Sequence, residues 1–388
     1  MKPLMRPMKL AGSELVFGEG ALAHLRHIQA KKCVIVLASD VMIKNNVMAI
    51  VEEHLNAANI PYNVFMGVES DPGLATVLRG AAFMIKEEPD LILAVGGGSC
   101  MDAAKAMWIY YEHPHLKTLA SLMEKDNFPK LRDKARFACV PSTAGTASEV
   151  SRSIVITDDE TGIKYGIGNM EMMPDIAICD PIATVSMPPH ITAETGMDAV
   201  AHALEALVST RANYLSDILA KAALIDAFKV LPKVYQNGHD MHLRETMLNV
   251  SMVAGLAFTN VSLGIVHSIA HSLGSLFNMP HGLTNAILLP YVVAFNQQDK
   301  RAAARYDALA EALGVVDLAE ALYNLNKTLD LPVSLSERLP DETAFMDKLD
   351  TLIQLSVNDG CTKTNPIQPT YEAFVALVLD AYHGRLKR

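Results

Sequence analysis

Apolar runs of strand length alternate with helix-length segments through the first half of the chain. The strand-like runs lie at residues 33–38, 62–66, 91–95, 137–140, 154–157 and 176–179. Segments of helical length occupy residues 41–57 and 74–87, between the first three runs. Strands that are separated by helices predict a parallel sheet with helices on both of its faces. We therefore expect an α/β domain over residues 1–185.

The pattern changes near residue 187. Strand signals stop there, the pair Pro188-Pro189 marks the boundary, and long segments rich in Ala, Leu, Met and His continue to the C-terminus. We therefore expect an all-α domain over residues 186–388. No Asp, Glu, Lys or Arg occurs from Thr246 to Gln298, which would also suit a membrane helix. Histidine, asparagine and glycine interrupt this stretch so often that a buried helical core is the better prediction.

Four histidines and one aspartate gather in the second half, and four of these five residues form two helical pairs. His202 follows Asp198 by one helical turn, His271 follows His267 by one turn, and His281 comes next. Each pair alone could be a solvated pair or a set of core histidines. Together, in an uncharged apolar stretch, they predict a site for a divalent transition metal, because burying several imidazoles without partners is costly.

A glycine-rich turn follows the run at 91–95 directly. Gly96-Gly97-Gly98-Ser99 leads into a helical segment, and a strand, a glycine turn and a helix N-terminus together form an anion site. We expect Ser99 to cap this helix and Asp102 to complete a capping box. The fingerprint GxGxxG is not satisfied, because Met101 stands at its last glycine position. On its own the turn could therefore be purely structural.

Two further features suit a dinucleotide. Residues 141–149 follow another strand and are rich in small hydroxyl side chains, which bind ribose and phosphate but also form plain turns. Asp40 stands just after the first clear strand, where a carboxylate can bind the adenosine ribose and repel a 2′-phosphate. Asp40 could equally be a helix N-cap. We expect NAD(H) as the cofactor, in preference to NADP(H).

Composition narrows the class of protein. The net charge of −10 argues against nucleic acid and anionic membranes as partners. The five cysteines are scattered and odd in number, which is typical of reduced thiols in a cytoplasmic protein. The first twelve residues contain two prolines and no long apolar run, so we expect no signal peptide.

These motifs together resemble the iron-containing (group III) alcohol dehydrogenase family, which includes lactaldehyde reductase and 1,3-propanediol dehydrogenase. The resemblance covers nearly the whole chain. Its most specific segments are GGGSCMDAAK at 96–105, PSTAGTASEV at 141–150, MPPHITAETGMDAVAHALEA at 187–206 and HSIAHSLGSLFNMPHGLTNAILLP at 267–290. It implies a dehydroquinate synthase-like fold, in which an α/β NAD-binding domain precedes an all-helical domain that binds metal and substrate.

The resemblance also implies roles for individual residues. The metal ligands would be Asp198, His202, His267 and His281. His271 would lie beside the metal and face substrate and nicotinamide. The cofactor would contact Gly97, Gly98, Ser99, Asp102, Thr143, Thr146, Ser148 and Lys164. One departure is Asp71, since members of the family often have Asn there.

The expected reaction is hydride transfer between a small neutral primary alcohol or diol and NAD. Three imidazoles and one carboxylate suit Fe²⁺, Zn²⁺ or Mn²⁺ at a catalytic site, and the family favours Fe²⁺. Such a metal polarises the alcohol oxygen, and His271 is the best candidate to relay the proton. A homodimer or a higher homo-oligomer is expected.

Three alternatives have less support. The pair His239-Asp240 could belong to a metal-dependent phosphohydrolase, but it lacks partners at matching helical positions. A lyase of the dehydroquinate synthase kind would need a basic pocket, and residues 246–298 offer no Lys or Arg. A metal-binding protein without enzymatic activity would leave both cofactor loops unexplained.

Overall fold

The computed structural model describes residues 7–122 and 128–387. The chain divides into two compact units. The first contains the residues up to 143 together with 147–184, and the second contains residues 144–146 and 185–388.

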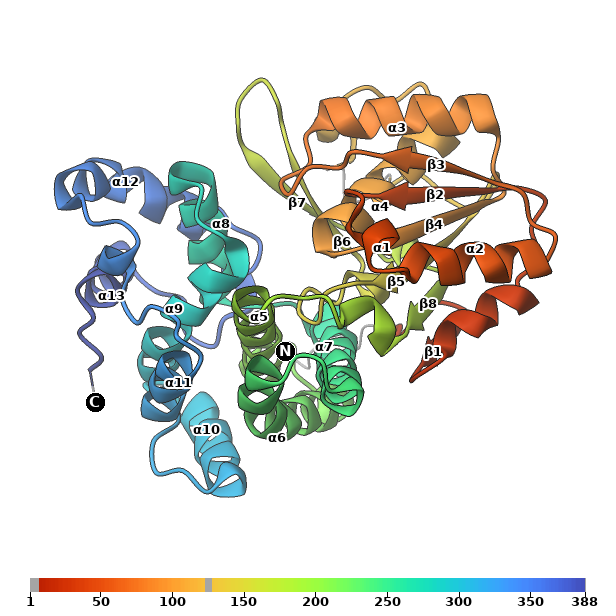
Figure 1. Cartoon of the computed structure of the whole chain (residues 1–388). Helices are drawn as coiled ribbons and strands as arrows, with labels where there is room; N and C mark the ends of the chain where they lie inside the picture. The colour runs from red at the N-terminus through yellow and green to blue at the C-terminus, as the bar shows by residue number, and fades with distance from the viewer. Residues whose placement is uncertain (1–6, 123–127, 388) are drawn as a thin grey trace. The chain divides into compact units, whose positions relative to one another are not determined.

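A six-stranded parallel sheet forms the centre of the first unit (Figure 1). Its strand order is β1-β8-β5-β4-β2-β3, and each neighbouring pair is parallel. The strands are β1 (Glu14–Phe17), β2 (Cys33–Leu37), β3 (Tyr62–Met66), β4 (Leu91–Gly96), β5 (Arg136–Pro141) and β8 (Ile176–Cys179). The parallel α/β architecture predicted from the sequence is therefore confirmed.

Helices bury both faces of this sheet. They are α1 (Val41–Lys44), α2 (Val47–Ala57), α3 (Leu74–Glu87) and α4 (Gly98–Glu112). Val34 and Val36 of β2 pack in one core with residues of α3 and α4, whereas Ile35 packs in the other core with residues of α2. Because the central strands are covered twice, they appear in the sequence as continuous apolar runs.

Three details of this unit differ from the expectation. The run at 154–157 belongs to β6 (Ser153–Thr157), which pairs antiparallel with β7 (Lys164–Gly168) in a separate hairpin. The single helix expected over 41–57 is broken into α1 and α2, because Asn46 adopts a left-handed conformation with φ 62°. The edge strand β1 was not predicted from the sequence.

The second unit is helical. Its helices are α5 (Pro189–Val208), α6 (Tyr214–Gln236), α7 (Met241–Val261), α8 (Ile265–Phe277), α9 (His281–Asn296), α10 (Lys300–Leu313), α11 (Leu318–Thr328), α12 (Glu342–Asn358) and α13 (Tyr371–His383). Helix α5 packs against α6, α7 and α9, and α8 packs against α9 and α12. These contacts gather the histidine-bearing segments.

The uncharged stretch forms most of α7 and all of α8 and α9, which are mostly buried within this unit. Among the described residues, no single helix has the length and apolar character needed to cross a membrane. Helices α7 and α8 meet that test only as a pair, and the chain bends by 99° between them.

Candidate metal centre and cofactor loops

Four of the predicted metal-site side chains lie close together in the helical unit. Ligand atoms of Asp198, His267 and His281, one from each, lie within 4.8 Å of one another, and His202 lies beside this group. Asp198 and His202 lie one turn apart on α5, His267 lies in the first turn of α8, and His281 begins α9. Asp198 Oδ1 lies 3.8 Å from Nε2 of His202. It lies 3.6 Å from Nε2 of His267 and 3.7 Å from Nε2 of His281. Atoms that share one ion at about 2.0–2.2 Å stand about 3–4 Å apart, so this spacing fits a bound cation.

Burial suits metal binding, and so does the protonation state of Asp198 and His202. Asp198, His202 and His267 are buried, whereas His281 has 41% of its side chain exposed. Burial alone would lower the pKa of His267, but the carboxylates of Glu205 and Asp198 raise it to about 9, so this imidazole would lose a proton on binding a metal. Burial lowers the pKa of His202 to about 4, so its imidazole is neutral near pH 7. Burial alone would raise the pKa of Asp198, but the facing imidazoles hold it well below its usual range. A neutral imidazole and an ionised carboxylate are the forms that bind metals.

A backbone carbonyl orients one of these imidazoles. Nδ1 of His202 donates a hydrogen bond to the carbonyl oxygen of Gly145, 3.2 Å away. A Cβ at Gly145 would lie 2.5 Å from the carbonyl oxygen of Thr195, so only glycine fits this close approach. With Nδ1 occupied, Nε2 of His202 presents its lone pair toward Asp198 and the other histidines.

Glu205 belongs to this centre although the sequence analysis did not single it out. It lies two turns after Asp198 on α5, and it is buried. Nδ1 of His267 donates to Glu205 Oε2 at 2.5 Å, and the backbone amide of Val266 donates to Oε1 at 2.7 Å. Two buried carboxylates surrounded by imidazoles and amides call for a positive charge, which a divalent cation would supply. The described residues therefore fit a metal.

Asn285 is a second residue that the sequence analysis missed. It lies one turn after His281 on α9 and is fully buried. Its Nδ2 donates to Asp198 Oδ1 at 2.7 Å and lies 3.2 and 3.1 Å from Nε2 of His267 and His281. Its Oδ1 has no hydrogen-bond partner among the described residues. Asn285 could have been found in the sequence, because it follows His281 by four residues, which places both side chains on one face of a helix.

His271 lies beside the four converging side chains. Its ring is nearly parallel to that of His281, with 5.5 Å between the ring centroids. Its Nδ1 is held by Asp359, at 2.9 Å from Oδ2. Asp359 follows the end of α12 and was also missed, because it is 88 residues from its partner.

The glycine turn of the first unit opens the helix α4. Gly97 is the N-cap and Gly98 the first helical residue, and no side chain caps the helix. The expected capping box is therefore wrong. Ser99 lies inside the first turn, and its Oγ donates to the carbonyl oxygen of Ser70. The amides at the start of α4 are thus not used by a side-chain cap, which is the condition for binding a phosphate there.

Asp102 connects α4 to the loop that follows β5. Its Oδ1 accepts from Ser148 Oγ at 2.6 Å, and its Oδ2 accepts from the backbone amide of Val155 at 2.9 Å. Ser148 Oγ also accepts from Nζ of the buried Lys105 at 2.9 Å. Both predicted cofactor residues thus have partners within the protein, and these contacts fix the loop to the helix.

Thr143 lies against the glycine turn. A Cβ at Gly97 would lie 3.2 Å from Thr143 Cγ2, so the glycine leaves room for this side chain. Thr143 Oγ1 is buried and has no hydrogen-bond partner among the described residues. An unpaired buried hydroxyl beside a helix N-terminus fits a ligand with phosphate or ribose oxygens. Thr146 belongs to the segment 144–146, which groups with the second unit.

The remaining predicted cofactor residues form ion pairs. Lys164 Nζ lies 2.8 Å from Oδ1 of Asp71. Asp71, which stands where members of the family often have Asn, therefore pairs with the predicted cofactor lysine. Asp40 follows β2 and precedes α1, and its side chain does not cap that helix. Its carboxylate pairs with Lys44 at 2.7 Å, and both side chains are largely exposed.

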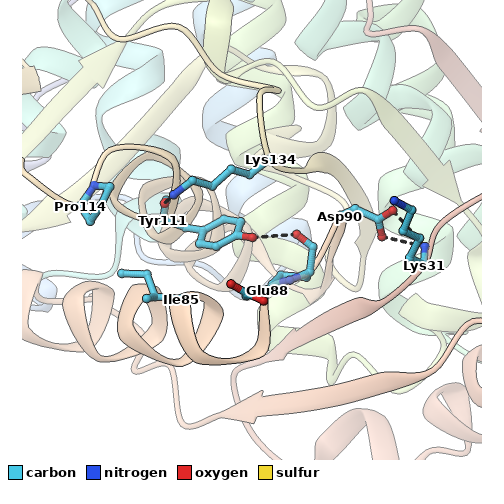
Figure 2. Close-up of a pocket in the computed structure, with 8 residues that line it drawn as sticks. Lys31, Ile85, Glu88, Asp90, Tyr111, Pro114 and Lys134 are labelled. Atoms are coloured by element: carbon cyan, nitrogen blue, oxygen red, sulfur yellow. Dashed lines mark hydrogen bonds between the residues drawn. The ribbon is translucent and has the colours of Figure 1, made fainter.

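A surface cavity of about 470 Å³ lies elsewhere on the first unit (Figure 2). It is found where β2, β4 and β5 begin, and none of the predicted site residues lines it. Several of its polar groups are paired with one another. Tyr111 donates to the carbonyl oxygen of Pro89, and Asp90 accepts from the backbone amide of Lys31. We assign no function to this cavity.

Comparison with known proteins gives matches along almost the whole chain. Residues 12–181 match the model for iron-containing alcohol dehydrogenase, and residues 192–382 match that for the C-terminal part of the Fe-containing alcohol dehydrogenase family. An NADPH-dependent butanol dehydrogenase of Clostridium saccharobutylicum is 40% identical over 380 residues, which cover 96% of this chain and 97% of that protein.

Two further comparisons extend this similarity. Aldehyde-alcohol dehydrogenase 2 of Entamoeba histolytica is 35% identical over 95% of this chain, which spans only 46% of that longer protein. The solved structure of an iron-containing alcohol dehydrogenase from Thermococcus thioreducens matches with a TM-score of 0.90 at 31% identity. That match covers 98% of this chain and 100% of the other.

Proposed function

Because the chain belongs to the iron-containing alcohol dehydrogenase family, we propose that it interconverts small primary alcohols or diols and their aldehydes with NAD(H). The convergence of Asp198 with three histidines carries this proposal. The first unit would bind the cofactor through its glycine turn and through the segment 141–149, here called the Thr143 loop. The second unit would bind metal and substrate.

The proposed metal ligands are Asp198, His202, His267 and His281, and Fe²⁺ is the ion that we propose. A divalent metal held there would act as a Lewis acid toward an alcohol or carbonyl oxygen. Side chains of this protein determine the charge and polarity around the ion. Asp198 and Glu205 together balance the charge of a divalent ion, and the uncharged helices α8 and α9 favour a neutral substrate over an acid or a sugar phosphate.

His271 is the proposed proton acceptor in alcohol oxidation. Nε2 of His271 would accept the proton of the alcohol hydroxyl and then release it to solvent. The nicotinamide, when bound, would accept the hydride of the carbinol carbon, so that the products would be an aldehyde, the reduced cofactor and one proton. The exposure of about a quarter of its side chain (26%) allows that release.

The preference for NAD(H) rests on Asp40. Its carboxylate stands at the carboxyl end of β2, where an adenosine ribose is bound in dinucleotide folds, and a 2′-phosphate would meet like charge there. The exposed pair with Lys44 reduces this repulsion only slightly. The similar butanol dehydrogenase is NADPH-dependent, so the preference needs a direct test.

A cytoplasmic location and a homo-oligomeric state are also proposed. All five cysteines lie in the described residues and none is in a disulfide, which suits a reducing compartment. The strand β1 forms one edge of the sheet, and Phe17 at its end is 56% exposed, which suits association with a second copy. Light scattering coupled to gel filtration measures the mass in solution, and a monomer at micromolar concentration would contradict the oligomer.

The activity can be tested with purified protein loaded anaerobically with Fe²⁺. We expect it to oxidise NADH in the presence of propanal or butanal, and to lose this activity when a chelator removes the metal. Parallel assays with Zn²⁺ and Mn²⁺ identify the preferred ion. A metal-loaded protein that reduces no small aldehyde with either NADH or NADPH would refute the proposal.

A further inference from the structure

Asp359 is fixed in place by donors from three directions. The backbone amide of Cys361 donates to its Oδ1 at 2.7 Å, and Ser268 Oγ donates to the same oxygen at 3.3 Å. His271 Nδ1 donates to the other oxygen, Oδ2, at 2.9 Å. The carboxylate is therefore held between the end of α12 and the face of α8 that carries the histidines.

The serine that holds Asp359 is itself restrained. Ser268 is fully buried, and its Oγ accepts from Thr362 Oγ1 at 2.8 Å. Thr362 Oγ1 also contacts the carbonyl oxygen of Ser356 at 2.7 Å. This buried network spans α8, α12 and the turn after α12, so the orientation of the Asp359 carboxylate is set by the fold and does not depend on a ligand.

An ionised carboxylate at Nδ1 determines which nitrogen of an imidazole carries the proton. Burial alone would raise the pKa of Asp359, but the hydrogen bond from His271 holds it well below its usual range, so it is ionised at neutral pH. A carboxylate can only accept, so His271 must carry its proton on Nδ1. Its Nε2 then remains as the nitrogen with a free lone pair.

We infer that Asp359 is a positioning residue that keeps His271 in the tautomer able to accept the alcohol proton at Nε2. This inference rests on the proposed function of His271. Asp359 touches neither substrate nor cofactor in this scheme, and it acts only through the imidazole. Its effect on catalysis should therefore disappear when His271 is absent.

The substitution Asp359→Asn tests this role with little change of shape. The Cys361 amide and Ser268 hydroxyl both donate to Oδ1, so the carboxamide oxygen is expected to stay at that position. Its NH₂ group would then face Nδ1 of His271 and donate to it, which reverses the tautomer. The matched control is Asp350→Asn, within the preceding helix α12, where the exposed carboxylate accepts from Gln354 and Tyr371.

The kinetic arm compares Asp359→Asn in the wild-type and His271→Gln backgrounds. In the wild-type background we expect kcat for alcohol oxidation to fall about 10²-fold, the lower end of general acid–base effects. Metal content should stay at the wild-type level, and Asp350→Asn should match the wild type. In the His271→Gln background, Asp359→Asn should change kcat by less than about twofold. An undiminished kcat, a loss that persists without His271, or a loss of metal would each overturn the inference.

A spectroscopic arm does not depend on turnover. In zinc-loaded protein labelled with ¹⁵N-histidine, the ¹⁵N shifts of His271, assigned by comparison with His271→Gln, should show the proton on Nδ1. Asp359→Asn should move it to Nε2, and Asp350→Asn should not. If the wild-type enzyme has no activity but shows this tautomer, the proposed function fails while the positioning by Asp359 stands. If wild-type His271 carries its proton on Nε2, the inference is wrong whatever the activity.

Discussion

At the scale of single residues, Glu149 is an unusual carboxylic acid. It lies at the end of the Thr143 loop in the first unit, it is 2% exposed, and no other described residue hydrogen-bonds to either of its oxygens. Burial raises its pKa to about 7, and its own backbone amide and the cation of Lys105 offset this only in part. The thiols of Cys139 and Cys179 are the other ionisable groups that interact with it.

This acid should make stability depend on pH. Because its folded pKa is raised from 4.5 to about 7, the native state binds more protons than the unfolded state across that window, and stability is lost as pH rises through it. The shift corresponds to about 3 kcal/mol. We expect Glu149→Gln to be more stable than wild type at pH 8 and to lack the part of the pH dependence that Glu149 causes. Urea unfolding at a series of pH values, followed by fluorescence of the buried Trp108, the one tryptophan of the chain, measures the free energy of unfolding. An equal dependence of this free energy on pH in the two proteins would contradict the prediction.

The proposed ligands give a second prediction at this scale. His267→Ala and His281→Ala should each lower bound metal well below one ion per chain, because each removes a nitrogen that faces Asp198 Oδ1. Elemental analysis after gel filtration measures the content. The matched control is His242→Ala, which removes an exposed imidazole on α7. Full metal content in both site variants would show that the ligand set is wrong.

Glu205 gives a third prediction at this scale. Replacing Glu205 by Gln keeps the shape of the side chain but removes the charge that faces Nδ1 of His267. Loss of such a carboxylate partner typically costs 10–100-fold in metal affinity, so we expect a drop of about 10-fold or more in competition with a chelator of known affinity. Unchanged affinity would mean that Glu205 supports the fold of α5 and α8 only.

At the scale of elements, the sequence pattern predicts those segments whose environment is uniform along their length. The strands β2 and β4 are buried on both faces and appear as continuous apolar runs. The strand β7 (KYGIG) is half-buried and contains two glycines, and β1 is a short edge strand. Neither has a signal that a pattern of apolar residues can detect.

The residues of the candidate site likewise divide into those that the sequence predicts and those that it does not. Asp198, His202, His267 and His281 are detectable because helical spacing joins two of them and an uncharged stretch surrounds the others. Glu205 and Asp359 act on histidines that are 62 and 88 residues away. Only packing of α5 and α12 against their neighbours brings them there, and a single sequence contains no measure of such contacts.

The prediction on cofactor preference concerns Asp40, which lies between β2 and α1. We expect the wild type to have a higher kcat/KM with NADH than with NADPH, and Asp40→Gly to narrow this ratio by about tenfold, equivalent to about 1.4 kcal/mol. Lys44→Ala is the companion variant, since it removes the cation that pairs with Asp40 and should widen the ratio slightly. A wild type that favours NADPH would show that Asp40 does not select the cofactor.

At the scale of the whole molecule, the metal should contribute to stability. The second unit buries two carboxylates among imidazoles, and an ion that binds only the folded form stabilises it by mass action. At a free metal concentration of 100 times Kd the gain is about 2.7 kcal/mol. We expect calorimetry to show a higher Tm with Zn²⁺ than after chelation. The difference should vanish in His267→Ala, and a wild-type Tm that is indifferent to metal would contradict the prediction.

The five thiols of the molecule differ in their accessibility to chemical reagents. Four are buried, and burial raises the pKa of each above its ordinary value: Cys33, Cys100, Cys139 and Cys179. Cys361 alone is partly exposed, and it lies beside His271 and Asp359. An alkylating reagent should therefore label the folded protein at one position. The native chain thus contains an attachment point for a fluorine or spin label, from which the distance to a paramagnetic ion could be measured without introducing a new cysteine.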